Sequence, residues 1–196
     1  MSEEATKPEP KLPPTHDSHG ANPRVLEENQ VDHEQLRAKL AGKFSDIVTE
    51  FKQTIIKTDR ENVIGALSIL KNDPELDYAM ITDITAVDNM RRDDFEPERR
   101  FTVIHTVYSV SNRKRVRLET SVPENDPRIG TAGDVYLGAT WIEREVYDMF
   151  GITFDGHPNM KRVLLPDYYE HHPLRKDYPL TGRGERDNFV RAEEMQ

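Results

Sequence analysis

The 196-residue sequence contains no cysteine. The chain therefore forms no disulfide bond and offers no thiolate to an iron–sulfur cluster, and we expect it to lie in a reducing compartment. It also has no apolar run that approaches the roughly 18 residues of a membrane-spanning helix. Any association with a membrane is expected to go through a partner.

Basic residues are scarce relative to acids: 27 Lys and Arg oppose 36 Asp and Glu, for a formal net charge of −9. Proteins bind phosphate backbones through clustered Lys and Arg. Because no long basic stripe occurs here, nucleic acid is not an expected partner. Hydrophobic residues make up 35% of the chain, below the roughly 45–50% of globular proteins, which indicates one domain with polar extensions.

Residues 1–30 are acidic and rich in proline, a composition that predicts a disordered lead-in. Their start lacks the apolar stretch of a secretory signal and is too acidic for an Arg-rich transit peptide. His16 and His19 are conceivable metal ligands, but no third ligand lies near them in the sequence. A solvated tail explains them better.

Hydrophobic periodicity predicts three helices in a core domain that spans residues 31–165: about 32–42, 60–72 and 131–150. Thr58 and Glu61 match a capping box at the start of the second helix. Thr131 with Asp134 opens the third. Together with the strands described next, these helices predict an α+β fold.

Strand-like runs occur at residues 46–57 (one or two strands), 77–87, 101–110 and 114–122, and residues 123–130 form a turn. In the last strand, apolar side chains alternate with polar ones from Arg115 to Val122. This alternation predicts a mixed or antiparallel sheet with one wet face and with helices packed on the other face. His105 lies in the middle of a strand, and we interpret it as a packed or edge histidine and not as a ligand.

Four charged side chains stand within six residues near the end of the third helix: Glu143, Arg144, Glu145 and Asp148. Gly151 suits the left-handed position that closes such a helix. Arg144 and Asp148 are four residues apart and can pair on the helix surface. Glu145 lies beside bulky apolar residues, and we expect it to accept hydrogen bonds, with Arg162 and Arg175 as candidate donors.

The same helix end resembles the core of the Nudix box of diphosphate hydrolases, with Gly130 at the upstream spacing. That chemistry needs several carboxylates on one helix face to hold divalent metals. Met149 and Tyr136 stand where two of those acids belong, which leaves Glu145 and Asp148. A free-standing Nudix-like hydrolase remains an alternative from a different functional class.

Three histidines follow the helix: His157, His171 and His172. A catalytic histidine needs a nucleophile and an orienting carboxylate, and the spacing singles out neither. A metal site built from all three lacks the helical spacing of known zinc motifs. A structural role is the favoured interpretation.

Residues 166–196 form an extended C-terminal arm with no period of their own. Prolines at 166, 173 and 179 fix φ and reduce the disorder that docking must remove. Leu174, Tyr178 and Leu180 are candidate anchors, each contributing about 1.5–3 kcal/mol if fully buried. We expect the arm to dock on a partner protein, and residues 152–166 to fold back in part on their own domain.

Two segments of the chain, together covering about residues 140–180, resemble the signature of one family, the respiratory complex I 30-kilodalton subunit (the C subunit of NADH–quinone oxidoreductase). The residues that carry the resemblance, and that are its candidate signature and partner-interface residues, are Glu143, Arg144, Glu145, Asp148, Gly151, His157, Pro158, Arg162, His172, Pro173, Leu174, Arg175, Lys176, Asp177, Tyr178 and Pro179.

The resemblance implies a structural subunit in the peripheral arm of a proton-translocating NADH:quinone oxidoreductase. It implies no catalytic, cofactor-binding or metal-binding residues in this chain, with flavin mononucleotide and iron–sulfur clusters held by partner subunits. The C-terminal arm would wrap the D subunit of complex I, expected as a separate polypeptide, and the complex would lie at the cytoplasmic side of the bacterial inner membrane. The equivalent subunit of a related membrane-bound hydrogenase or another quinone-linked dehydrogenase is the alternative within the family.

Overall fold

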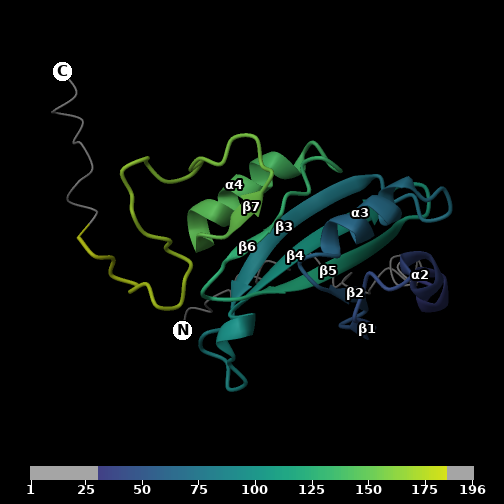
Figure 1. Ribbon diagram of the computed structural model, residues 1–196, viewed down its shortest axis with the longest axis horizontal. Coiled ribbons are helices and arrows are strands. Elements are labelled where there is room, and N and C mark those ends of the chain that lie inside the picture. The colour runs from purple at the N-terminus through teal and green to yellow at the C-terminus, as the bar shows by residue number, and fades with distance from the viewer. Residues whose placement is uncertain (1–30, 185–196) are drawn as a thin grey trace, which may run out of the picture.

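The computed structural model describes residues 31–184. Figure 1 labels its elements, which in chain order are α2 (His33–Leu40), β1 (Asp46–Glu50), β2 (Gln53–Thr58), α3 (Val63–Asn72), β3 (Met80–Asp88), η1 (Pro97–Arg99), β4 (Phe101–Ser109), β5 (Lys114–Val122), β6 (Arg128–Gly130), α4 (Ala139–Phe150) and β7 (Thr153–Asp155). The expected lead-in, with His16 and His19, lies outside the described residues.

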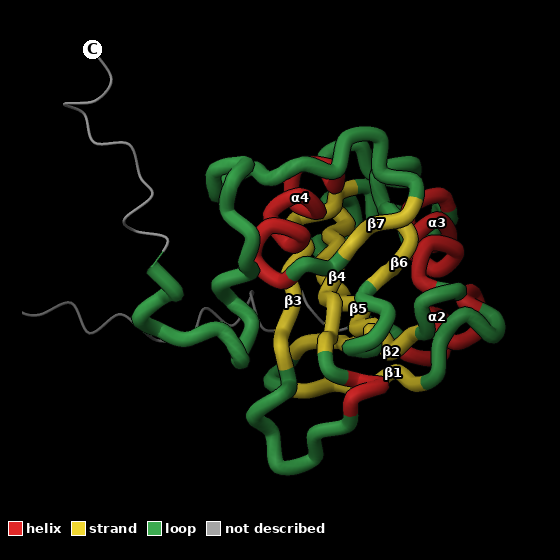
Figure 2. The backbone as a smooth tube through the Cα atoms, turned by 60° about the vertical axis from the view of Figure 1, so that its left-hand side comes forward, coloured by secondary structure: helices red, strands yellow, loops and turns green. Residues whose placement is uncertain are grey.

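Five strands form one sheet in the order β1-β2-β5-β4-β3. The β2–β5 pair is parallel and the other neighbours are antiparallel, so the sheet is mixed. Helices α3 and α4 lie on the same side of this sheet (Figure 1). The short parallel pair β6–β7 lies between these two helices (Figure 2). The predicted α+β fold is confirmed.

Strand β5 shows how the sequence sets the two faces of the sheet. Val116, Leu118 and Val122 are buried, whereas Arg115 and Ser121 on the alternate positions are exposed. Side chains of a strand point to opposite faces in turn. The predicted division into one packed face and one wet face is therefore confirmed.

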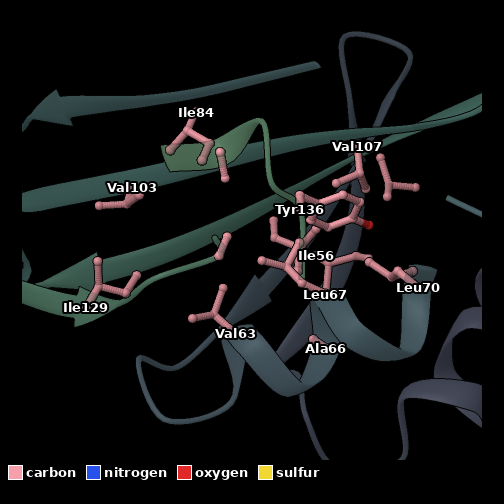
Figure 3. Close-up of a cluster of buried hydrophobic side chains, with 14 of the residues drawn as sticks. Ile56, Val63, Ala66, Leu67, Leu70, Ile84, Val103, Val107, Ile129 and Tyr136 are labelled. Carbon is pink, nitrogen blue, oxygen red and sulfur yellow. The ribbon is translucent and has the colours of Figure 1, made fainter. Parts of the chain in front are cut away.

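Helix α3 supplies a large part of the core. Its fully buried residues Val63, Ala66, Leu67 and Leu70 recur at the three- and four-residue spacing of one helix face. Figure 3 shows these side chains directed toward residues of the strands, among them Ile56. Burial of each large aliphatic side chain contributes roughly 1.5–3 kcal/mol, and the packing fixes α3 across the sheet.

The predicted start of this helix was wrong. The helix begins at Val63 after the N-cap Asn62, and Asn62 makes no side-chain capping bond. The Thr58 hydroxyl donates to the Lys43 carbonyl at 3.0 Å instead of closing a capping box with Glu61. A tertiary bond to the loop after α2 has replaced the local one.

The third predicted helix is also shorter than expected, since α4 begins only at Ala139. Residues 131–138 form turns and a bend, with the Thr131 hydroxyl and the Ala132 amide bound by the Glu143 side chain. The Tyr136 hydroxyl donates to the Tyr78 carbonyl at 2.7 Å. Part of the expected turn at 123–130 is strand β6, which pairs with β7.

His105 lies in the centre of β4, opposite Ile84 on one side and Leu118 on the other. It is completely buried, and neither ring nitrogen has a hydrogen-bond partner within the described part of the chain. Burial lowers the pKa of His105 to about 4 from its ordinary 6.5. The predicted packed histidine is confirmed, and it is held in its neutral form.

This burial predicts an acid sensitivity. Between pH 6.5 and 4 the unfolded chain binds a proton at His105 that the folded chain excludes, so stability falls as the pH falls, by up to about 3 kcal/mol. In urea unfolding, His105→Leu should become more stable relative to wild type as the pH drops through this window. Val103→Ala, on the same face of β4, should lower the free energy of unfolding by the same amount at every pH. If the difference in unfolding free energy between His105→Leu and wild type were also independent of pH, the argument would be contradicted.

Candidate functional site

The residues of the signature converge at the C-terminal end of α4. This helix ends at Phe150, and Gly151 adopts a left-handed φ of 72° while its amide donates to the Tyr147 carbonyl at 2.8 Å. A Cβ at Gly151 would lie 2.5 Å from Arg175 Nη2 and 2.6 Å from the His172 ring. Glycine is thus required twice, by conformation and by the close approach of the arm.

The arm supplies partners for the last carbonyls of α4, which have none within the helix. The Leu174 amide donates to the Met149 carbonyl at 3.1 Å. The Arg175 Nε donates to the Phe150 carbonyl at 2.5 Å. A cation here also meets the negative end of the helix dipole, so the arm segment is held by both hydrogen bonds and charge.

Asp148 holds residues 162–165, the segment that leads into the arm, through its buried carboxylate. Its Oδ1 accepts from Arg162 Nη1 at 2.6 Å. Its Oδ2 accepts from three consecutive backbone amides, those of Val163, Leu164 and Leu165, at 3.0, 2.8 and 2.9 Å. Burial opposes ionisation of this carboxyl, yet the Leu165 amide and the Arg162 guanidinium hold its pKa below the ordinary value.

The Asp148 backbone is engaged as well. Its carbonyl accepts from Arg162 Nη1 at 3.3 Å and lies 3.0 Å from His172 Nδ1. Arg162, before the arm, and His172, within it, therefore meet at one residue of α4 although they are ten positions apart in the sequence. We call this set of contacts, between Asp148–Gly151 and residues 162–175, the clasp.

Glu143 secures the other end of the helix. Its side chain is fully buried and accepts from the Thr131 hydroxyl and the Ala132 amide, both at 2.6 Å. Burial raises the pKa of Glu143, and the Thr131 and Ala132 bonds oppose that rise. The His157 Nδ1 accepts from the Asn159 amide at 3.0 Å, which leaves Nε2 to donate to the Thr140 carbonyl at 2.9 Å.

The predicted Arg144–Asp148 pair was wrong, as were both candidate donors to Glu145. Arg144 donates to the carbonyls of Lys161 and Arg162, each at 2.8 Å. Arg162 forms its ion pair with Asp148, and Glu145 is exposed to solvent. Helical spacing located the charged cluster correctly but could not show that the chain after Gly151 returns to it.

The arm is held at a third place, around Arg100, that the sequence analysis did not predict. Arg100 is buried and binds Asp88 through two bonds, Nε–Oδ1 at 3.3 Å and Nη2–Oδ2 at 3.1 Å. Its guanidinium also meets Glu124 at 2.5 Å and Asp177 of the arm at 3.0 Å. The Lys176 amide donates to Asp88 Oδ2 at 2.9 Å.

No local pattern could have revealed this cluster, because its acids come from three segments far apart in the sequence. Burial opposes ionisation of Asp88, but the Arg100 guanidinium and the Lys176 amide hold its pKa below the ordinary value. Through the Arg100 cluster the arm is bound to the end of the sheet, in addition to its separate bonds to α4. The arm thus contacts its own domain as far as Asp177, further than the expected limit of 166.

The hydroxyl of the buried Tyr169 lies 2.7 Å from that of Tyr178. After Tyr178 the arm turns outward, and Leu180 is fully exposed. Among the remaining signature residues, Pro158 and Pro179 are exposed, Pro173 is half-buried and Leu174 keeps an exposed side chain. Figure 2 shows this part of the chain running past α4 and the end of β3.

The arrangement does not suit the hydrolase alternative. Glu143 points into the domain, Asp148 is saturated by protein donors, and Glu145 stands alone at the surface. Within residues 31–184, no group of three or more His, Cys, Asp or Glu side chains could hold a metal ion. His157, His171 and His172 are likewise not gathered into a metal site.

Replacing Asp148 should weaken the fold. Asp148→Asn leaves Arg162 without its charge partner and places an amide against hydrogen-bond donors, at a cost of about 3 kcal/mol. Glu145→Gln on the same helix should change stability by less than about 0.5 kcal/mol. The gap between wild type and Asp148→Asn should narrow as the pH falls below the ordinary Asp value of 3.8. Equal unfolding free energies for the two variants would contradict the clasp.

Gly151→Ala should loosen the arm. Gly42 provides a matched control, because its φ of +79° is also left-handed but nothing lies within 4 Å of an added Cβ. Both alanines should suffer strain of about 1–2 kcal/mol. Only Gly151→Ala should also displace the arm, with faster trypsin cleavage after Arg175. Identical cleavage rates in the two variants would show that the arm does not rest on Gly151.

Within the described residues, no helix is long and apolar enough to cross a membrane.

The chain matches the family of the respiratory-chain NADH dehydrogenase 30 Kd subunit over residues 56–184. It is 42% identical over 150 residues to the NADH-quinone oxidoreductase C subunit of Trichlorobacter lovleyi, covering 74% of this chain and 89% of that protein. It is 39% identical over 155 residues to the C/D subunit of the same enzyme from a Psychrobacter species, covering 76% of this chain and 26% of that protein.

A solved structure shares the fold. It is a trypsin-resistant fragment (1–134) of Nqo5, with a TM-score of 0.55 and 31% identity, and the match covers 64% of this chain and 94% of that fragment. The matched residues 56–184 include the whole clasp. The chain belongs to the family of the 30-kDa subunit of respiratory-chain NADH dehydrogenase.

Proposed function

We propose that this chain is a structural subunit in the peripheral arm of an NADH–quinone oxidoreductase and that it contributes no catalytic residue. The relatives that it resembles are C subunits of that enzyme. One observation carries the proposal: the polar side chains of the signature hold the arm. The side chains of Glu143, Asp148 and Arg162 bind other groups of this protein.

The D subunit is the partner proposed for the arm. The Psychrobacter relative bears the names of the C and D subunits together, which supports close association of the two in the assembled enzyme. The contacts of the arm with its own domain reach Asp177, and the next apolar side chain after Tyr178 and Pro179, that of Leu180, is fully exposed. The arm is thus fixed on its own domain up to Asp177 and exposes an apolar side chain directly after it. This suits docking on a neighbour, because an arm that is already partly ordered loses little conformational entropy on binding.

The electrons would pass through other subunits. With no cysteine in its 196 residues, the chain offers no thiolate for an iron–sulfur cluster. We therefore place the flavin mononucleotide and the clusters in partner subunits. Attachment to the membrane would be indirect, through the complex, at the cytoplasmic side of a bacterial inner membrane.

Purification through a tag on this chain tests the proposal. Under native conditions the tag should bring down a flavin- and cluster-containing assembly that reduces quinone with NADH. Hydrogen oxidation by the purified assembly would favour the membrane-bound hydrogenase alternative. Turnover of nucleoside diphosphates by the isolated chain with magnesium would contradict a purely structural role.

Two truncations separate the arm's roles. A chain that ends at Pro179 keeps the clasp, so it should unfold within a few degrees of wild type yet fail to bring down the D subunit. A chain that ends at Pro166 also loses the partners of the α4 carbonyls, so it should be less stable by a few kcal/mol. Recovery of the complete complex with the chain that ends at Pro179 would overturn the proposed docking.

A further inference from the structure

An exposed apolar surface lies on the outer side of α4 and the segment beside it. The exposed fractions are 87% for Leu137, 64% for Trp141, 60% for Leu164 and 37% for Val163. Single exposed apolar residues are common, but a group that contains a tryptophan and spans two segments marks an interaction surface. We call these four residues the α4 face.

The two halves of the α4 face are joined by Arg144. Its guanidinium carbon lies 4.9 Å from the centre of the Trp141 ring. The same guanidinium donates to the carbonyls of Lys161 and Arg162, each at 2.8 Å. Trp141 is thereby held against the segment that carries Val163 and Leu164, whose amides are fixed by Asp148. The surface is rigid before any partner arrives, which limits the entropy lost on binding.

We propose that the α4 face is a second docking surface for the D subunit, with Trp141 as its central anchor. This inference rests on the proposed function, which names the D subunit as the partner of the arm. Val163 and Leu164 of the α4 face are held by Asp148 at the start of the segment that leaves the domain after Asp177. The α4 face is therefore continuous along the chain with the proposed binding region of the arm, so one partner can cover both.

The residue types also fit a protein partner. Tryptophan and arginine are among the side chains most often found at the energetic centre of protein interfaces. Arg144 lies against Trp141, and it binds the carbonyl of Lys161, which is exposed. The complementary surface on the D subunit should therefore combine an apolar pocket with carboxylates at its edge. Charge of opposite sign at the rim speeds and orients docking.

Trp141 is the single tryptophan of the chain, so fluorine-labelled tryptophan reports on this site alone. In the isolated full-length chain its NMR signal should be sensitive to a soluble quencher. Addition of the unlabelled D subunit should shift the signal and remove that sensitivity. If the Trp141 signal of the isolated chain is already protected from the quencher, the chain's own tail covers the α4 face. If this protection grows with protein concentration, a second copy of the chain covers the face. Either result overturns the proposal.

Substitution gives an independent test with a matched control. Trp141→Ala should weaken the binding of the D subunit at least tenfold, as should Leu137→Ser, which removes a side chain too exposed to matter for folding. Phe51→Ala removes an aromatic residue that is 96% exposed in the β1–β2 turn and should bind like wild type. Thermal unfolding of each variant checks the fold.

The outcomes distinguish the two proposals. If wild type does not bind the D subunit, both fail. If truncation at Pro179 abolishes binding while Trp141→Ala and Leu137→Ser bind like wild type, the arm docks as proposed and the α4 face plays no part. Loss of affinity in Trp141→Ala and Leu137→Ser, with Phe51→Ala unchanged, supports the docking surface.

Discussion

The end of helix α4 is the constraint on which the rest of the structure depends. The carbonyls of its last four residues, Tyr147 to Phe150, all accept hydrogen bonds from groups outside the helix ladder or at its cap. Buried carbonyls without partners destabilise a fold by about 1–3 kcal/mol each. The chain after Gly151 must therefore return to α4, and Asp148 with Arg162 determines where it does so.

This constraint gives the signature residues a physical meaning. Gly151 permits the turn, Asp148 gathers three amides, and Arg100 fixes Asp177 at the end of the sheet. These groups are engaged with the protein itself and are not directed toward a substrate. A family signature can thus describe how a segment is positioned for assembly, and its charged residues need not be catalytic.

Local patterns predicted those parts of the fold that depend on local physics. The alternation in β5, the apolar stripe of α3 and the helix-closing Gly151 all appear in the structure as expected. The charged cluster at 143–148 was also located correctly.

Long-range pairing could not be predicted in this way. Thr131 was expected to start a helix, but its hydroxyl binds Glu143. Arg162 was assigned to Glu145, whereas its partner is Asp148, which lies further along the same helix. The Arg100 cluster joins residues separated by up to 89 positions, from Asp88 to Asp177, and no spacing in one sequence encodes such a contact.

Hydrogen exchange measured amide by amide tests the central claim most directly. The claim is that the root of the arm is fixed on its own domain while its outer part is completed by a partner. The amides of Val163, Leu164, Leu165 and Leu174 should be protected in the isolated chain, and those of Leu180 and Thr181 only in the presence of the D subunit. Rapid exchange at all six positions in the isolated chain would contradict the account.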